Sequence, residues 1–271
     1  MKWFFYLGLF LSGAGLLISL ANLILAPGAG LISLLFGIGW AALFTWLLAT
    51  SRLWPVGLGK RWVAAALAWG AGTSLLLVMA GSGGYMEATR LAGSELTMAS
   101  FAGALPEEVA KGLGAFFIIY LCPRIIRPYH ALTVGILVGL GFEAMENFGY
   151  GTVGAMYHPS SDLLGMLQMW GLRTVAGPGL HMVFTGILAY GLGLWLFTSH
   201  TWRVALGAWG LSTLFHFWWN LQPSSEPVQI ASLIACAIVM YATFIAVVIH
   251  ALRAARADTS LYDTPTLLLR V

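Results

Sequence analysis

Long apolar runs with almost no charge fill most of this chain, and they leave few folds open to it. A helix of about 20 apolar residues crosses the ~30 Å hydrocarbon core of a bilayer. Such runs lie at 3–25, 28–50, 62–80, 104–121, 130–154, 178–198, 203–222 and 229–252. Because backbone groups in lipid must find partners within their own segment, each run should form a helix. The sequence therefore predicts an all-α, polytopic membrane bundle of about eight transmembrane helices.

The composition agrees with a chain whose main solvent is lipid. Apolar residues make up 59% of the chain and charged residues 8%, against roughly 45–50% and 25% in soluble domains. Gly135 and Gly139 form a GxxxG step of the kind that lets membrane helices approach closely. We expect a single transmembrane domain at 1–252 and a cytoplasmic tail at 253–271.

The basic residues gather in every second connection between the predicted helices. They are Lys2, Arg52, Lys60, Arg61, Arg124, Arg127, Arg203, Arg253, Arg256 and Arg270. Because Lys and Arg are enriched in cytoplasmic loops, both termini should be cytoplasmic, and the long connections 81–103 and 155–177 should lie outside. This topology explains the net charge of +3 without a nucleic-acid partner. The high apolar content with few lysines suits a bacterial plasma membrane.

Polar side chains within the predicted spans are few, and an ionisable group in lipid usually marks a functional site. They occur in "LPEEVAKGLG", "GFEAMENFGY", "GLHMVFTG" and "FHFWWN". The residues are Glu107, Glu108, Lys111, Glu143, Glu146, Asn147, His181, Thr185, His216 and Asn220. Many are spaced like His216 and Asn220, four residues apart, so that they share one helical face.

These polar groups are predicted to lie at one depth in the membrane. The spans at 104–121 and 178–198 start outside, so their polar residues lie in the first turns of the outer half. On the spans that start inside, Glu146 and His216 come about 20–25 Å above the cytoplasmic face, at 1.5 Å per residue. We therefore expect one water-accessible cavity in the outer half of the bilayer, with 104–222 as the catalytic core.

Two histidines beside several carboxylates suit zinc, which takes imidazole nitrogen and carboxylate oxygen. Glu146, His181 and His216 supply the three protein ligands of a catalytic zinc site, with a water in the fourth position. The metal would activate this water and polarise a carbonyl. A further glutamate, Glu107 or Glu108, would take the water's proton and pass it to the leaving amine.

Other polar residues could assist this chemistry. Lys111 could neutralise one of the two adjacent glutamates and leave the other as the base. Asn220 or Arg173 could donate a hydrogen bond to the developing oxyanion. Three further residues are expected to hold the metal ligands in place by packing or hydrogen bonding: Glu143, Asn147 and Thr185. The chain has no HExxH and no GxSxG motif, and every aspartate lies outside the predicted spans, which disfavours other hydrolase mechanisms.

"EEVAK", "FEAMEN", "HMVFTG" and "HFWWN", in this order on successive spans, resemble the motifs of the PrsW family of intramembrane proteases. The similarity covers 104–222 and extends distantly to the CAAX prenyl endopeptidases and bacteriocin-processing membrane proteases. It implies hydrolysis of a peptide bond in a single-span, membrane-anchored protein, such as an anti-sigma factor, on the extracytoplasmic side.

The resemblance also implies roles for particular residues. Glu107 and Glu108 would be essential acids. Glu146 would replace a histidine that the prenyl endopeptidases have on this helix, and His181 and His216 would complete the site. Two mechanisms fit these motifs, one with a bound metal and one with a glutamate-activated water alone.

Two other classes of function fit some of these features. A non-catalytic scaffold of the same superfamily could use a buried polar cluster for assembly. A proton-coupled transporter could use intramembrane acids and histidines as a relay, but it should carry polar groups through the whole thickness of the membrane and broken helices in paired halves. The inner halves of the spans between 104 and 222 are apolar, which favours the protease.

Overall fold

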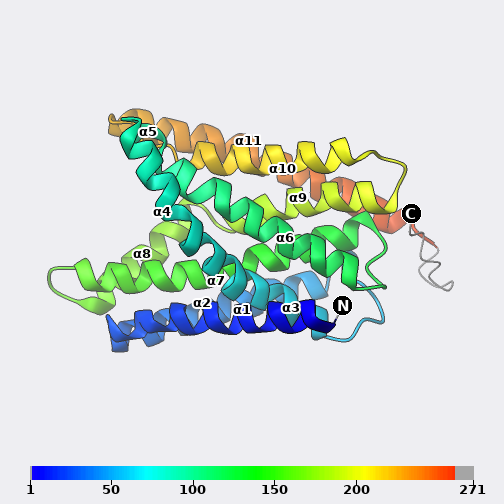
Figure 1. Ribbon diagram of the computed structural model, residues 1–271, viewed down its shortest axis with the longest axis horizontal. Helices are drawn as coiled ribbons and strands as arrows, with labels where there is room; N and C mark the ends of the chain where they lie inside the picture. Colours follow the sequence, from blue (N-terminus) through cyan, green and yellow to red (C-terminus); the bar gives the residue numbers. More distant parts are fainter. Residues whose placement is uncertain (1, 260–271) are drawn as a thin grey trace.

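The computed structural model describes residues 2–259, and this range is helical without any strand. Met1 and residues 260–271 lie outside the described part, and with them Arg270 and most of the predicted cytoplasmic tail. Figure 1 shows long helices that run back and forth between two ends of a bundle, with the start of α1 and the end of α11 at the same end. The predicted all-α membrane bundle is confirmed.

The helices are separated by short connections, and η1 is a 3-10 helix whereas η2 and η3 are π-helical. In chain order they are α1 (Lys2–Leu20), η1 (Ala21–Ile24), α2 (Pro27–Ala49), α3 (Arg61–Ala68), η2 (Trp69–Ser74), α4 (Leu75–Leu91), α5 (Glu95–Ala99), η3 (Ser100–Ala104), α6 (Leu105–Leu121), α7 (Pro128–Tyr157), α8 (Asp162–Ala176), α9 (Leu180–Phe197), α10 (Trp202–Trp219) and α11 (Glu226–Ala257). Proline stands in the first turn of α2, α7 and α11, where its missing N–H is not needed.

Six stretches of the described chain are long and apolar enough to cross a membrane. They are Tyr6–Ile24, Pro27–Ala49, Arg61–Leu91, Pro128–Tyr157, Asp162–Phe197 and Glu226–Ala257. The helices α6 and α10 are not among them, although both lie within the bundle (Figure 1). The predicted number of about eight spans is therefore approximate, while the polytopic helical architecture holds.

The connection predicted at 81–103 is mostly helical in the structure. From Arg61 the chain stays helical through η2 to Leu91, although Gly81, Gly83 and Gly84 follow Ala80, and no proline interrupts this stretch. The helix ends at Leu91, and Gly93 just beyond it has a φ of 68°, in the left-handed region that favours glycine. The chain is helical again from Glu95, so only 92–94 connects the two stretches.

The helix α7 lies at the centre of the bundle and packs against α9, α2 and α8. In the most apolar 18-residue segment of α7, 94% of the residues are buried. In the corresponding segment of α11 only 11% are buried, so this helix faces outward. A Cβ added at Gly139 would overlap the backbone of His181, and one added at Gly135 would overlap that of Thr185. This close glycine contact brings the polar face of α7 against the start of α9.

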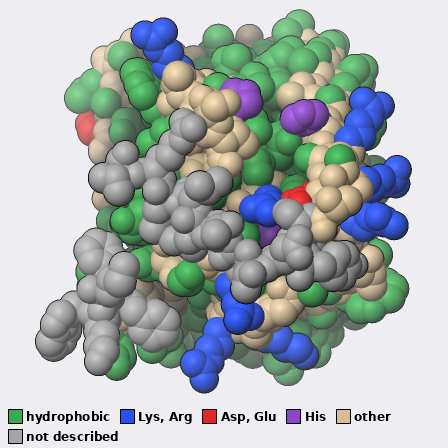
Figure 2. Space-filling view, turned by 90° about the vertical axis from the view of Figure 1, so that its right-hand side faces the viewer, with side chains coloured by type: hydrophobic (Ala, Val, Ile, Leu, Met, Phe, Trp, Pro, Cys, Tyr) green, Lys and Arg blue, Asp and Glu red, His purple; other side chains and the backbone are tan. Residues whose placement is uncertain are grey.

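One end of the bundle carries a rim of Lys and Arg side chains (Figure 2). The α2–α3, α6–α7 and α9–α10 connections and the end of α11 all lie at this end (Figure 1). Arg124 donates a 2.6 Å hydrogen bond to the Gly57 carbonyl, and Arg127 pairs with Asp258 at 2.6 Å. The basic connections therefore share one end, which the positive-inside rule would place in the cytoplasm.

A cysteine introduced at Lys60 should be reached only from the cytoplasm, and one at Ala92 only from outside. Both positions are exposed, and they lie in connections at opposite ends of the bundle. The measurement is the labelling of intact cells with a membrane-impermeant maleimide, in a variant whose Cys122 and Cys236 are replaced by alanine. Labelling of Lys60→Cys in intact cells would overturn the proposed orientation.

Candidate active site

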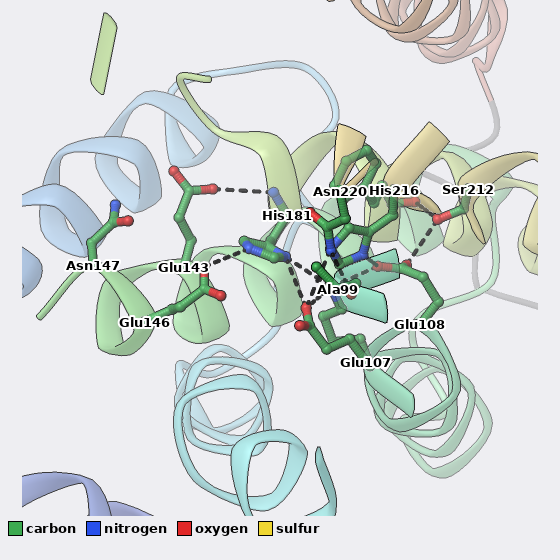
Figure 3. Close-up of polar contacts among 12 residues, drawn as sticks. Ala99, Glu107, Glu108, Glu143, Glu146, Asn147, His181, Ser212, His216 and Asn220 are labelled. Carbon is green, nitrogen blue, oxygen red and sulfur yellow. Dashed lines mark hydrogen bonds and ion pairs between the residues drawn. The ribbon is translucent and has the colours of Figure 1, made fainter. Parts of the chain in front are cut away.

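The helices α6, α7, α9 and α10 bring their polar residues together in one buried cluster. Figure 3 shows Glu107 and Glu108 of α6 beside His216 of α10, with His181 of α9 between them and Glu146 of α7. The cluster lies at the first turn of α9 and the last turn of α10. The cluster residues on α6 lie near the middle of the continuous helical stretch Glu95–Leu121. Glu107 is thus deeper in its helix than predicted, because α5 and η3 add turns before it.

The charged residues of α6 are almost completely removed from solvent. Glu107 is 6% exposed, and Glu108 and Lys111 are both 0% exposed. The π-helical segment η3 precedes them, and Ser100 in it donates a 2.8 Å hydrogen bond to the carbonyl of Phe217 on α10. This bond fixes the start of α6 against α10, so the carboxylates of α6 face the histidine of α10.

The Lys111 ammonium is the central cation of the cluster. Its Nζ lies 2.7 Å from Oε1 of Glu108 and 3.4 Å from Oε2 of Glu107. It also lies 2.8 Å from Nδ1 of His181, which accepts this hydrogen bond because an ammonium can only donate. Buried charges are costly unless they are paired, and this ammonium meets both carboxylates of its own helix.

The imidazole of His216 is held by Glu108. Nδ1 of His216 donates to Oε1 of Glu108 over 2.8 Å, and the Ser212 hydroxyl lies 2.8 Å from the other oxygen of that carboxylate. With its proton on Nδ1, His216 keeps a lone pair on Nε2. This Nε2 lies 3.7 Å from Oε2 of Glu107. Sequence reasoning missed the supporting role of Ser212, although its spacing of four residues from His216 places both on one face.

The imidazole of His181 is held in the same way by Glu146. Its Nε2 donates to Oε2 of Glu146 over 2.8 Å, and its Nδ1 lies 3.6 Å from Oε2 of Glu107. Each histidine therefore has one ring nitrogen on a carboxylate, called here the outer nitrogen (Nδ1 of His216, Nε2 of His181). The other ring nitrogen, the inner one, is on the side of Glu107. A carboxylate behind a histidine is the usual device that orients a metal-binding imidazole and fixes its tautomer.

The guanidinium of Arg173, on α8, closes one side of the cluster. It pairs with Oε2 of Glu146 and donates to Oδ1 of Asn147, and it lies 4.2 Å from the ring centroid of Tyr150. The side chains of Arg173 and Glu146 are 21% and 20% exposed, respectively. Of the contacts around the cluster, this pair is therefore the one most open to an incoming group.

Glu143 holds the start of α9 in place. Its carboxylate accepts hydrogen bonds from the backbone N–H of Gly179 at 3.0 Å and of His181 at 3.2 Å. These are N–H groups at a helix N-terminus, which have no partner within the helix. Gly179 itself has a φ of 74°, which lets the chain turn into α9 directly before His181.

Asn220 lies at the edge of the cluster, and Thr185 lies one turn after His181 on α9. The side-chain nitrogen of Asn220 is 3.5 Å from the carbonyl of Ala99, which is a long hydrogen bond. A Cβ added at Gly103 would lie 2.8 Å from that nitrogen and 3.3 Å from Oε1 of Glu107, so the amide and this oxygen border the same small space. The Thr185 hydroxyl is buried without a hydrogen-bond partner.

Glu107, His181 and His216 form a group that could hold a metal ion, with ligand atoms within 4.8 Å of one another. Their donor atoms suit zinc, and each imidazole is oriented by a carboxylate on its other ring nitrogen. This set differs from the predicted one because Glu107 stands in it and Glu146 does not. Glu146 instead contacts the outer nitrogen of His181 and Arg173, so it lies behind the histidine relative to Glu107.

Replacing Glu143 with alanine should lower the free energy of unfolding by about 1–3 kcal/mol, because two buried N–H groups of α9 lose their acceptor. The matched control is Glu226→Ala, which removes an exposed glutamate at the start of α11. The measurement is thermal unfolding of the purified proteins in detergent. Equal midpoints for the two variants would contradict the capping role.

Comparison with known proteins agrees with the resemblance seen in the sequence motifs. A model of the PrsW family, described as an intramembrane metalloprotease family, matches residues 59–252, which is a wider range than the four motifs span. No curated protein and no solved structure matches the chain. Because the family match covers most of the chain and includes all four helices of the buried cluster, the protein belongs to the PrsW family of intramembrane metalloproteases.

Proposed function

We propose that this protein is an endopeptidase that hydrolyses a peptide bond of a membrane-anchored protein with a water molecule activated between Glu107, His181 and His216. The observation that carries the proposal is the arrangement of the two histidines. Each has its outer nitrogen on a carboxylate, at 2.8 Å in both cases, and its inner nitrogen directed toward Glu107. Such an arrangement places the unprotonated nitrogens of both rings and one carboxylate around one small volume, with Nδ1 of His181 accepting a hydrogen bond from Lys111.

The same three residues suit two versions of the chemistry. When a zinc ion is bound, it would supply Lewis acidity and an activated water. Glu107, His181 and His216 would be its protein ligands, as the short distances between their donor atoms suggest. Without a metal, Glu107 would take the proton of the water directly and the free lone pair on Nε2 of His216 would orient that water.

The contacts of Glu108 favour an orienting role for it over that of a base. Its two oxygens already meet Lys111, His216 and Ser212, and its side chain is fully buried. A base must reach the proton that it removes. Glu107 faces both histidines and borders the space beside Gly103, so it is the better placed of the two adjacent acids.

The amide of Asn220 borders the space next to Glu107, so it is the donor best placed to stabilise an oxyanion there. Arg173 contacts Glu146 on the partly exposed side of the cluster, where it could instead meet the backbone of an incoming substrate. A donor that meets the charge as it develops lowers the barrier of acyl transfer. Lys111 would compensate the buried carboxylates and so keep Glu107 and Glu108 ionised together.

The proposed substrate is a single-span membrane protein, such as an anti-sigma factor, cleaved in the extracytoplasmic half of the bilayer. The cluster lies where α9 begins and α10 ends, away from the basic end of the bundle. Under the positive-inside rule that basic end faces the cytoplasm of a bacterial cell. A substrate anchored in the membrane would present its cleavage site at this depth without crossing water.

Replacing Glu107 with glutamine should abolish proteolysis, with a loss of about 100-fold or more, because a general base contributes roughly 10²–10⁴ in rate. The measurement is a quantitative comparison of new protein N-termini from cells that express the wild type or a variant at matched abundance. The control is Glu95→Gln, an exposed glutamate on the same helical stretch. Termini that persist in Glu107→Gln would refute the site, and none in any strain would favour the scaffold function.

Removal of bound metal should separate the two versions of the chemistry. We expect about one zinc-like ion per chain in the purified protein, lost together with activity in His216→Ala and after stringent chelation. The measurement combines metal analysis with cleavage of a substrate identified from the new N-termini, and added zinc should restore the chelated wild type. Full activity in metal-free protein would support the glutamate-activated water alone.

A further inference from the structure

The Lys111 ammonium lies against two of the three residues that would hold a metal ion. It is 2.8 Å from Nδ1 of His181 and 3.4 Å from Oε2 of Glu107. Its side chain is completely buried, so water offers it no alternative partner. A cation of the protein itself thus occupies donors that an incoming metal ion would need.

His181 has no second lone pair to offer. Its Nε2 donates to Glu146, so the only lone pair of the ring is on Nδ1, and that lone pair accepts from Lys111. Rotation of the ring would break the bond to Glu146, whose carboxylate is itself held by Arg173. A lone pair that accepts a hydrogen bond from an ammonium cannot bind a metal ion at the same time.

Lys111 has other partners besides Glu107 and His181. Its Nζ lies 2.7 Å from Oε1 of Glu108, the shortest of its three polar contacts. The rings of Phe142 and Phe184 have centroids 4.6 Å and 5.9 Å from Nζ, within the range of cation–π attraction. The ammonium can therefore withdraw from Glu107 and His181 and still be charge-compensated.

We propose that Lys111 is a resident cation that competes with a divalent metal ion for Glu107 and His181, and that metal binds only when the ammonium withdraws onto Glu108. This inference rests on the metal-bound version of the proposed function. It explains how the metal-free protein can hold adjacent buried carboxylates, which without a cation would be strongly destabilising. The consequence is a metal affinity lower than the three ligands alone would give.

The test is a calorimetric titration of the purified full-length protein in detergent with zinc, after chelation and removal of the chelator. Lys111→Met should bind zinc at least tenfold more tightly than the wild type, because the competing cation is gone. The tighter binding should disappear when His216→Ala is added, which shows that it arises at this site. The control is Arg90→Met, which removes an exposed cation outside the cluster and should leave the affinity unchanged.

A second variant, Glu108→Gln with Lys111→Met, separates competition from net charge. It removes one positive and one negative charge, so the site keeps its net charge, and Glu107 is the one carboxylate of the pair that loses its contact with the ammonium. The amide carbonyl that the first substitution introduces can still accept from Nδ1 of His216. Tighter zinc binding in this double variant supports competition, whereas tighter binding in the single variant alone would mean that only charge is involved and would overturn the inference.

The remaining outcomes distinguish this inference from the proposed function. Equal or weaker zinc binding in both Lys111 variants, with the wild type still binding zinc, would overturn the competition and leave the metalloprotease site intact. No zinc binding by any of these proteins, with proteolysis retained by the wild type, would overturn both the competition and the metal-bound chemistry. The protease function itself would stand in that case.

Discussion

The burial of Glu107, Glu108 and Lys111 within one helix is the constraint on which the other contacts of the cluster depend. An ion moved from water into a medium of low dielectric constant loses several kcal/mol of solvation, and only close partners offset this loss. Lys111 meets both glutamates of its own helix, but this leaves carboxylate oxygens that need further donors. His216 and Ser212 of α10 supply donors to Glu108. His181 of α9 accepts from the same ammonium through Nδ1, so Lys111 links Glu107, Glu108 and His181.

Helices far apart in the sequence must approach closely for these contacts to form. Gly135 and Gly139 let α7 contact the backbone of α9, which brings Glu146 within 2.8 Å of His181. Glu143, three residues before Glu146, accepts the N–H groups at the start of α9. The central helix thus fixes both the position of His181 and the orientation of its ring, and the polar cluster and the glycine packing depend on each other.

The four glutamates of the cluster have different surroundings and therefore different tasks. Glu108 is enclosed by a lysine, a histidine and a serine, Glu143 binds backbone, and Glu146 lies between a histidine and the partly exposed Arg173. Glu107 alone faces the inner nitrogens of both histidines. The surroundings of a carboxylate decide whether it orients, compensates or reacts. In the proposed function, Glu107 would react while the other three glutamates hold the site in place.

Local periodicity and solvent preference were enough to predict the helical membrane fold, the alternation of basic connections and the polar faces on four helices. The packed structure was needed to show that Glu107 rather than Glu146 faces both histidines, that Ser212 supports Glu108, and that α6 continues an earlier helical stretch. Periodicity fixes the face on which a residue lies. Which oxygen meets which nitrogen depends on helix crossings that differ by a few ångströms, and those are set by packing between segments distant in the chain.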